Sequence, residues 1–447
     1  MVTMKVRWDR KGQTMEGFGV FAGREQPFAE SKYRDKIIER LFSLDGLGLT
    51  ILRGQLYPNL DCLTCTFPPD EARAEAQMIL LKEIKATYNI DKVILSSWSP
   101  PYNWKTFEDV PFGRVGCSFN KLTHTKYDDF AQYIVTYIEY CKHNGIDIYA
   151  ISPQNEPEFP TDLWEGCVWS PANLVHFLDK LKPLLETKGL NVQIMAGETA
   201  NWKIAGWYLY MMRRSMKDPY KQVDIVASHG YSLPQLGNLM VTYETSPGSW
   251  FLSRKFKRRW ITEASCTMCF DGSMTTAIKL ATSLHHFIAN NNVSAFIYWL
   301  AMVDHYSNEA LIFEDKDRDK LFYPKAFYIF GQFTKWVRPD MIRIDLTKKF
   351  FKYDSTGTMA SIYLNEKTNE FTLVVINPHK SKQSTFQLDF NGAQIQNETT
   401  LAGYKTSDQY DWEVMSVDEI VLKSDGSHLT LINEPYSVKT ITGKLVF

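Results

Sequence analysis

Eight short apolar segments recur along the first three-quarters of the chain, and amphipathic helical patterns separate them. The segments lie at 17–21, 49–53, 92–98, 148–156, 192–198, 224–231, 259–265 and 295–300. Strands that alternate with helices in this way pair in parallel, because each crossover helix covers a face of the sheet. Eight such units predict a closed (β/α)8 TIM barrel. A doubly wound open sheet is the alternative, but no GxGxxG motif follows any of the eight segments.

The helical patterns between these segments carry recognisable start signals. The stretch at 170–189 opens with Ser170 as N-cap and Pro171 in the first turn. Similar patterns lie at 31–43, 71–88 and 126–145.

The pattern changes near residue 335, where helical periodicity gives way to alternation of apolar and polar residues. The turn pairs Asn391-Gly392 and Asp425-Gly426 punctuate this region, as in an antiparallel sandwich. The N-terminal "VTMKVRW" alternates as well. We therefore predict an α/β protein with a barrel domain over 15–335. A side β-sandwich domain is predicted from both chain ends, residues 1–14 and 336–447.

The composition narrows the range of partners. The 447 residues include 50 basic and 51 acidic side chains, for a formal net charge of −1. Nucleic-acid and anionic-membrane partners call for a basic face, so we predict neither. No stretch reaches the roughly 20 apolar residues of a membrane span. Aromatic residues make up 14% of the chain, which fits either ring platforms for sugars or a larger core.

The N-terminal residues carry charges every few positions and no apolar h-region, so they do not form a signal peptide. We expect an extracellular protein whose leader is absent from this sequence; a cytoplasmic protein is the alternative. Two pairs of cysteines have CxxC spacing, Cys62–Cys65 and Cys266–Cys269. The pairs lie about two hundred residues apart, and neither has the surroundings of a zinc knuckle. We predict local disulfides or free thiols there, and no metal or cofactor.

Two of the predicted strands end in a lone carboxylate. The fourth strand ends at Asn155-Glu156 and the seventh at Glu263. The carboxyl ends of barrel strands share one mouth, so these side chains are predicted to face each other there. An acid and a nucleophile so paired can cleave a glycosidic bond, and retention requires a separation of about 5–5.5 Å. Either glutamate alone could instead be a helix cap.

Several motifs extend this pattern along the chain. They are "QNEP" at 154–157, "TEAS" at 262–265, "SSWSPPYNW" at 96–104, "WEGCVWSPANLVHFL" at 164–178 and "GQFTKWVRP" at 331–339. Together they resemble glycoside hydrolase family 30. The resemblance implies a (β/α)8 barrel with a side β-domain built from both chain ends, and a retaining reaction.

The resemblance also implies roles for individual residues. Glu156 is similar to the acid/base of that family and Glu263 to its nucleophile. Asn155 is similar to the asparagine that binds the sugar 2-hydroxyl. Arg53 is expected beneath Glu263, where its charge would keep that carboxylate ionised. His229 would either bond the nucleophile or simply fill the end of its strand.

Aromatic residues complete the predicted substrate-binding set. Those at the ends of the third, sixth and eighth strands could wall the sugar subsite or pack in the core: Trp98, Tyr231 and Trp299. Those expected on loops could line outer subsites: Trp104, Trp164 and Trp169.

The specificity prediction rests on the segment after the eighth strand. It contains Asp304 and Glu309 and no arginine, whereas the glucuronoxylan-specific branch carries an arginine there to bind a uronate. The segment "WEGCVWSP" at 164–171 is most similar to the xylanase branch of the family. The resemblance therefore favours an endo-β-1,4-xylanase, and the missing arginine favours action on neutral or sparsely substituted chains of a polysaccharide or oligosaccharide. β-1,6-Glucanase and glucosylceramidase-like β-glucosidase activities are the alternatives. A non-catalytic carbohydrate-binding barrel is an alternative of another class, disfavoured because binding alone needs neither glutamate. The oligomeric state is left open.

Overall fold

A computed structural model describes residues 1–22, 25–58, 70–88, 90–215, 222–233, 241–250, 258–267, 270–348, 357–396 and 401–447. The cysteines Cys62, Cys65 and Cys269 lie outside these ranges, and so do the local pairings predicted for them. None of the described helices combines the length and apolar character needed to cross a bilayer.

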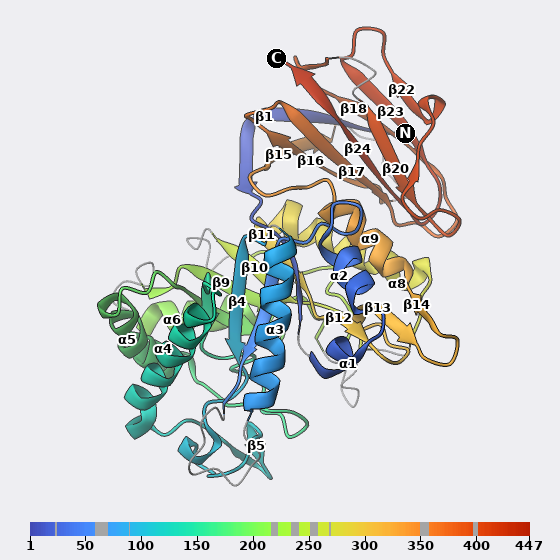
Figure 1. Cartoon of the computed structure of the whole chain (residues 1–447). Coiled ribbons are helices and arrows are strands. Elements are labelled where there is room, and N and C mark those ends of the chain that lie inside the picture. Colours follow the sequence, from blue (N-terminus) through green and yellow to red (C-terminus); the bar gives the residue numbers. More distant parts are fainter. Residues whose placement is uncertain are drawn as a thin grey trace.

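Eight parallel strands close into a barrel, in the order β10-β11-β2-β3-β4-β7-β8-β9 (Figure 1). Their bounds are β2 Gly17–Phe21, β3 Ile51–Leu56, β4 Lys92–Ser97, β7 Ala150–Ser152, β8 Gln193–Thr199, β9 Ile225–His229, β10 Arg259–Glu263 and β11 Val293–Tyr298. Each overlaps one of the eight segments predicted from the sequence, so the barrel is confirmed. Apolar side chains such as Ile51, Met195 and Trp260 fill its interior, as expected for strands buried on both faces.

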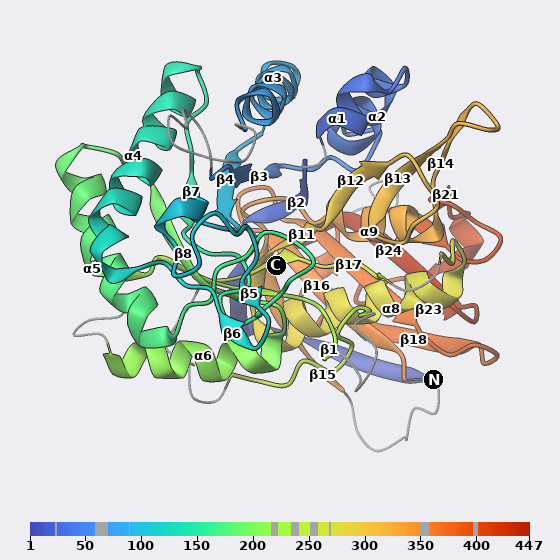
Figure 2. The same cartoon turned by 90° about the horizontal axis from the view of Figure 1, so that it is seen from below.

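Helices surround the barrel (Figure 2). They are α1 Glu25–Glu30, α2 Arg34–Phe42, α3 Glu71–Thr87, α4 Tyr127–His143, α5 Pro171–Thr187, α6 Trp202–Ser215, α8 Met274–His285 and α9 Lys325–Thr334. Short helical turns lie at Tyr102–Trp104, His124–Lys126, His286–Asn290 and Val417–Glu419. The predicted start of α5 is confirmed, because the Ser170 hydroxyl accepts the Asn173 N–H at 3.2 Å.

Two excursions leave the regular barrel. A hairpin of β5 Arg114–Val115 and β6 Ser118–Phe119 follows β4. It lies at the end of the barrel opposite the C-terminal sheet (Figure 1). A three-stranded sheet of β12 Leu300–Val303, β13 Ala310–Asp315 and β14 Lys320–Phe322 follows β11.

The remaining strands form one sheet of eleven strands built from both chain ends. Its members are β1 Val2–Thr14, β15 Ile342–Lys348, β16 Met359–Asn365, β17 Glu370–Asn377, β18 Ser384–Asp389, β19 Gln394–Ile395, β20 Ala402–Thr406, β21 Glu413–Val414, β22 Ile420–Leu422, β23 His428–Asn433 and β24 Ser437–Val446. As predicted, the N-terminal strand joins it: β1 pairs antiparallel with β15 and parallel with β18. The sequence predicted a sandwich of two sheets. In the structure, hydrogen bonds connect all of these strands into one sheet, which curls around its own apolar core.

Helix α9 joins the barrel to this sheet. The Gln332 amide donates to Thr406 Oγ1 at 2.9 Å, and Thr440 Oγ1 donates to the Gln332 carbonyl at 2.7 Å. The indole of Trp412 donates to the Tyr328 carbonyl at 2.6 Å. The same indole lies on Gly331, where an added Cβ would be 2.0 Å from Trp412 Cζ2. The two units therefore meet at a closely packed contact.

We expect Gly331→Ala to lower the free energy of unfolding by about 1–3 kcal/mol, because overpacking forces the rigid indole to move. In an uncrowded helix the same change would instead stabilise by up to about 1 kcal/mol. Urea denaturation distinguishes these signs. Gly113→Ala is the control, because its added Cβ would have no neighbour nearer than 3.4 Å.

Candidate active site

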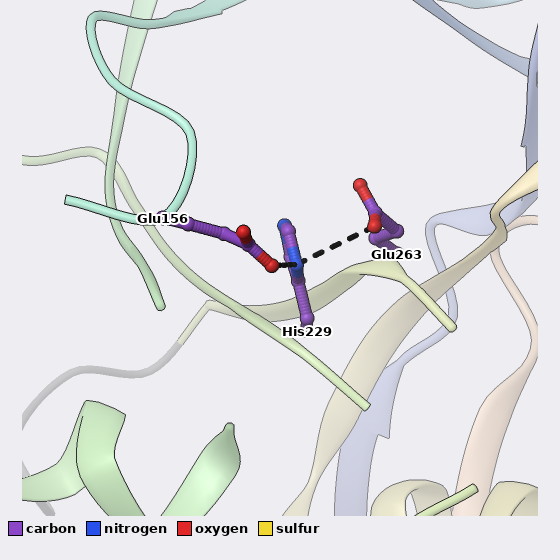
Figure 3. Close-up of side chains that lie close together, drawn as sticks. All are labelled: Glu156, His229 and Glu263. Carbon is purple, nitrogen blue, oxygen red and sulfur yellow. Dashed lines mark hydrogen bonds and ion pairs between the residues drawn. The ribbon is translucent and has the colours of Figure 1, made fainter. Parts of the chain in front are cut away.

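The carboxylates of Glu156 and Glu263 converge at the carboxyl ends of the strands, as the sequence predicted. Glu263 is the last residue of β10, and Glu156 lies in the turn after β7 with a left-handed φ of 47°. The Glu156 N–H donates to the Glu198 carbonyl at 2.9 Å, which fixes this turn. Both carboxylates point toward His229 from opposite sides (Figure 3).

The His229 ring lies between the two carboxylates. Its Nδ1 is 3.1 Å from Glu156 Oε1 and 3.7 Å from Glu263 Oε1. One ring nitrogen of His229 and one oxygen of each carboxylate all lie within 4.8 Å of one another. Burial lowers the pKa of His229, but Glu263 and the hydrogen bond to Glu156 outweigh it, so that the pKa is raised. His229 was expected either to bond the nucleophile or to fill the end of its strand. Its hydrogen bond is instead to Glu156, and Glu263 lies 3.7 Å away, within ion-pair distance.

Glu263 is held by two further donors. Arg53 Nη1 donates to Oε2 at 2.7 Å, and the Tyr231 hydroxyl donates to Oε1 at 2.8 Å. Burial raises the pKa of Glu263, and His229 and Arg53 lower it, with a net rise. Arg53 therefore has the predicted contact, but its effect on the pKa is smaller than that of burial.

Arg53 is the centre of the hydrogen-bond network. It is fully buried, and its Nη2 donates to Asn155 Oδ1 at 2.6 Å and to Glu198 Oε1 at 3.1 Å. Its Nε donates to Ser96 Oγ at 3.2 Å. One planar guanidinium from within β3 thus links β4, β8 and β10 with the turn after β7.

Two further carboxylates near the site were not predicted, the buried Glu198 and the half-buried Glu158. Glu198 lies near the end of the fifth barrel strand, where a carboxylate after an apolar run was the same signal that identified Glu156 and Glu263. Glu158 accepts the Ala200 N–H at 2.8 Å. Burial, followed by the charge of Glu156, raises the pKa of Glu158 to about 8. No comparable signal in the sequence distinguishes Glu158.

Aromatic rings lie against Arg53. Its guanidinium carbon is 4.7 Å from the ring centroid of Trp98 and 5.9 Å from that of Trp299. Trp299 stacks in parallel on Phe21, with centroids 4.8 Å apart. The predicted rings Trp98, Tyr231 and Trp299 therefore gather at this site, and Phe21 joins them. The run "GFGVF" gave no reason to select Phe21 over a core phenylalanine.

The three predicted loop tryptophans differ from one another. Trp164 is 41% exposed and stacks on Phe159, with centroids 5.8 Å apart. Trp104 is half-buried and packs edge-on against Tyr133. Both lie on segments that lead away from strand ends.

Trp169 lies on a loop, as predicted, but its ring is buried and is not open to an outer subsite. It is 3% exposed and packs in the core between helices. Its indole N–H donates to Gln154 Oε1 at 3.1 Å, and Gln154 Nε2 donates to the Trp98 carbonyl at 2.8 Å. A large apolar ring next to α5 gains more free energy from burial than from solvent contact, and from there it supports the turn that carries Glu156.

The segment after β11 contains more compensated charge than the sequence suggested. Asp304 forms an ion pair with Lys316 at 2.9 Å. Arg318 donates to the Tyr306 hydroxyl at 2.9 Å and lies 3.4 Å from Asp315. Lys316 therefore offsets the negative charge that was expected to act against a uronate at Asp304.

Glu156, His229 and Glu263 also form the one group among the described residues whose spacing could hold a metal ion. The Arg53 guanidinium lies 2.7 Å from Glu263 and would repel a divalent cation. The donor set therefore suits transfer of a proton between hydrogen-bonded groups better than metal binding.

Comparison with known proteins agrees with this geometry. A family model described as O-glycosyl hydrolase family 30 matches residues 67–217, which include the Glu156 turn. Over these residues the chain is therefore similar to glycoside hydrolase family 30. A family relative, the glucuronoxylanase XynC of Bacillus subtilis, is 23% identical over 351 residues, covering 74% of each chain.

Solved structures of family 30 and related hydrolases share the fold. The catalytic domain of the family 30 xylanase C from Talaromyces cellulolyticus superposes with a TM-score of 0.80 at 18% identity, covering 100% of both chains. An endo-β-1,6-glucanase superposes with a TM-score of 0.72 at 19% identity, covering 99% of this chain and 94% of the other.

Proposed function

We propose that this family 30 hydrolase cleaves β-linked polysaccharide with retention, with Glu263 as nucleophile and Glu156 as acid/base. The observation that carries the proposal is the pair of carboxylates on either side of His229. One oxygen of each carboxylate and a ring nitrogen of His229 all lie within 4.8 Å of one another. Retaining enzymes hold their carboxyl groups about 5–5.5 Å apart, and inverting enzymes leave about 6.5–9.5 Å for a water. The short spacing supports direct attack by Glu263.

In the first step, a Glu263 oxygen bonds to the anomeric carbon while the glycosidic C–O bond breaks. Glu156 gives its proton to the departing oxygen. In the second step, Glu156 takes a proton from water, whose oxygen displaces Glu263. Arg53 and Tyr231 orient Glu263 in both steps. The Asn155 Oδ1 is taken by Arg53, so its NH2 group is the donor available to a sugar hydroxyl.

We propose that the substrate is xylan and that the protein acts as an endo-β-1,4-xylanase. The relatives named as a glucuronoxylanase and a xylanase support this assignment. The flat rings of Trp98 and Trp299 suit stacking on a neutral sugar. A polymer of this kind is outside the cell, so the proposal includes secretion. The β-1,6-glucanase likeness keeps that activity as the second candidate.

The test is a hydrolysis screen over linear xylo-oligosaccharides, glucuronoxylan, β-1,6-glucan and aryl β-glycosides, with product sizing. We expect linear xylo-oligosaccharides to be cleaved at rates similar to or above those on glucuronoxylan. Demand for a uronate is best met by a bidentate arginine, and Arg318 is engaged with Tyr306 and Asp315.

Products in which every fragment carries one uronate at a fixed place would contradict this specificity. Release from β-1,6-glucan alone would support the second candidate. Binding of xylan in calorimetry without release of reducing ends would show a non-catalytic carbohydrate-binding barrel and reject the proposed chemistry.

A further inference from the structure

Glu198 is a buried carboxylate within the catalytic network. Its side chain is fully buried, and Oε1 accepts from Arg53 Nη2 at 3.1 Å and from Ser96 Oγ at 3.0 Å. A carboxylate in such surroundings is costly unless a cation compensates it. Arg53 is the cation that does so here. Glu198 and Glu263 thus share one guanidinium.

We propose that Glu198 is a positioning residue for the reaction described above. Its side chain holds Arg53 by a hydrogen bond and an ion pair, and its charge thereby limits how strongly Arg53 acts on Glu263. Its backbone fixes the turn that carries Glu156. This inference rests on the proposed function, because it assigns Glu198 a part in presenting the two reacting carboxylates.

The side-chain route passes through the guanidinium plane. Arg53 Nη2 is shared between Glu198 and Asn155, while Nη1 contacts Glu263 at 2.7 Å. Because the guanidinium is planar, bonds to Nη2 and to Nε set the direction in which Nη1 points. Glu198 and Ser96 provide those bonds on the side away from Glu263. The position of the nucleophile therefore depends on a residue that does not touch it.

The backbone route passes through two left-handed residues. Glu198 has a φ of 30° and Glu156 a φ of 47°, and the Glu198 carbonyl accepts the Glu156 N–H at 2.9 Å. Non-glycine residues adopt such angles at a cost in free energy, and they concentrate at functional sites. The preceding Gly197 has a φ of 102°, and an added Cβ would lie 2.7 Å from the Ala227 carbonyl. The end of β8 is therefore shaped to place its carbonyl against the catalytic turn.

Glu198 also changes the charge that Glu263 experiences. The groups that contact Glu263 are Arg53, Tyr231, His229 and, across the ring, Glu156. Arg53 lowers the pKa of Glu263, and the negative charge of Glu198 offsets part of that effect. Removal of the Glu198 charge would let Arg53 act on Glu263 more strongly.

The test is Glu198→Gln, which keeps the side-chain shape and an acceptor for Arg53 but removes the charge. We expect the acid limb of kcat/KM on an aryl β-xyloside to move to lower pH by about one pH unit. A ¹³C-glutamate NMR titration should show the same displacement for the Glu263 carboxyl, independently of turnover. The Glu263 signal is assigned by its loss in Glu263→Gln.

Glu16→Gln is the matched control, because Glu16 is a largely buried carboxylate paired with Arg258 at the opposite end of the same barrel. It should leave the acid limb and the Glu263 titration in place. If Glu198→Gln fails to fold, Glu198→Asp withdraws the carboxylate from Arg53 by one methylene and should give a smaller displacement in the same direction.

The backbone route has its own test in Gly197→Ala. Displacement of the Glu156 turn should impair substrates that need a proton on the leaving group about 10-fold more than nitrophenyl glycosides. Equal losses on both classes would overturn the backbone role. An unchanged Glu263 titration in folded Glu198→Gln would overturn the side-chain role, even if activity and thermal stability both fall. An inactive wild-type enzyme would instead reject the proposed function, and the NMR titration would still decide the side-chain role.

Discussion

Glu263→Gln is expected to abolish hydrolysis of every β-glycoside, with a loss in kcat of at least about 10⁴-fold. The amide cannot bond to the anomeric carbon, so no covalent intermediate forms. Glu156→Gln should give a similar loss on xylo-oligosaccharides, because an alkoxide departs only with a proton. On nitrophenyl glycosides the first step should be spared, because nitrophenolate departs unaided. Steady-state rates on both classes and a burst of nitrophenolate measure these effects.

The contrast between the two variants carries the assignment of roles. Equal losses for both variants on both classes of leaving group would show that the glutamates do not have separate functions. Glu370→Gln is the control, because it makes the same change at an exposed position in β17. It should leave both activities unaltered.

Arg53→Met is expected to lower the free energy of unfolding by about 3–5 kcal/mol at neutral pH, because it leaves buried carboxylates without their cation. The deficit should shrink as the pH falls. Arg53 lowers the pKa of Glu263, so its removal raises that pKa further above the unfolded value of about 4.5. The folded state then binds more protons than the unfolded state between those two values. Stability must therefore fall as the pH rises through that range. Thermal unfolding from pH 4 to pH 8 measures it.

Arg258→Met is the matched control for this prediction. Arg258 pairs with Glu16, but the Arg258 side chain is 32% exposed. When Arg258 is removed, water can therefore solvate the Glu16 carboxylate in its place. The loss should be smaller and should change less with pH. If both variants lose the same stability, burial of the Arg53 network does not have the energetic weight assigned to it.

Periodicity predicted the barrel because each barrel strand must bury both faces and each surrounding helix one face. The local order of apolar and polar residues shows this requirement. The carboxylates at strand ends were predictable for the same reason: Glu156 and Glu263 break an apolar run. Glu198 breaks its run in the same way, but no motif around it in the sequence distinguishes it from a helix cap. The burial of Trp169 could not be predicted, because a tryptophan on a loop has no local signature of burial. Its burial depends on α5 and on Gln154, which contact the ring from other parts of the chain.

Strand β1, at the start of the sequence, pairs with β15 and β18 from its last quarter. Val2 faces Phe386 and Met4 faces Lys348 in the sheet, so β1 leaves a ribosome long before its partners exist. Contacts of such sequence separation form late and slow folding. Until they form, β1 is an unpaired strand with an alternating apolar face, which favours pairing with other chains. The nascent barrel therefore has an association-prone end until β15 and β18 have been synthesised and pair with β1.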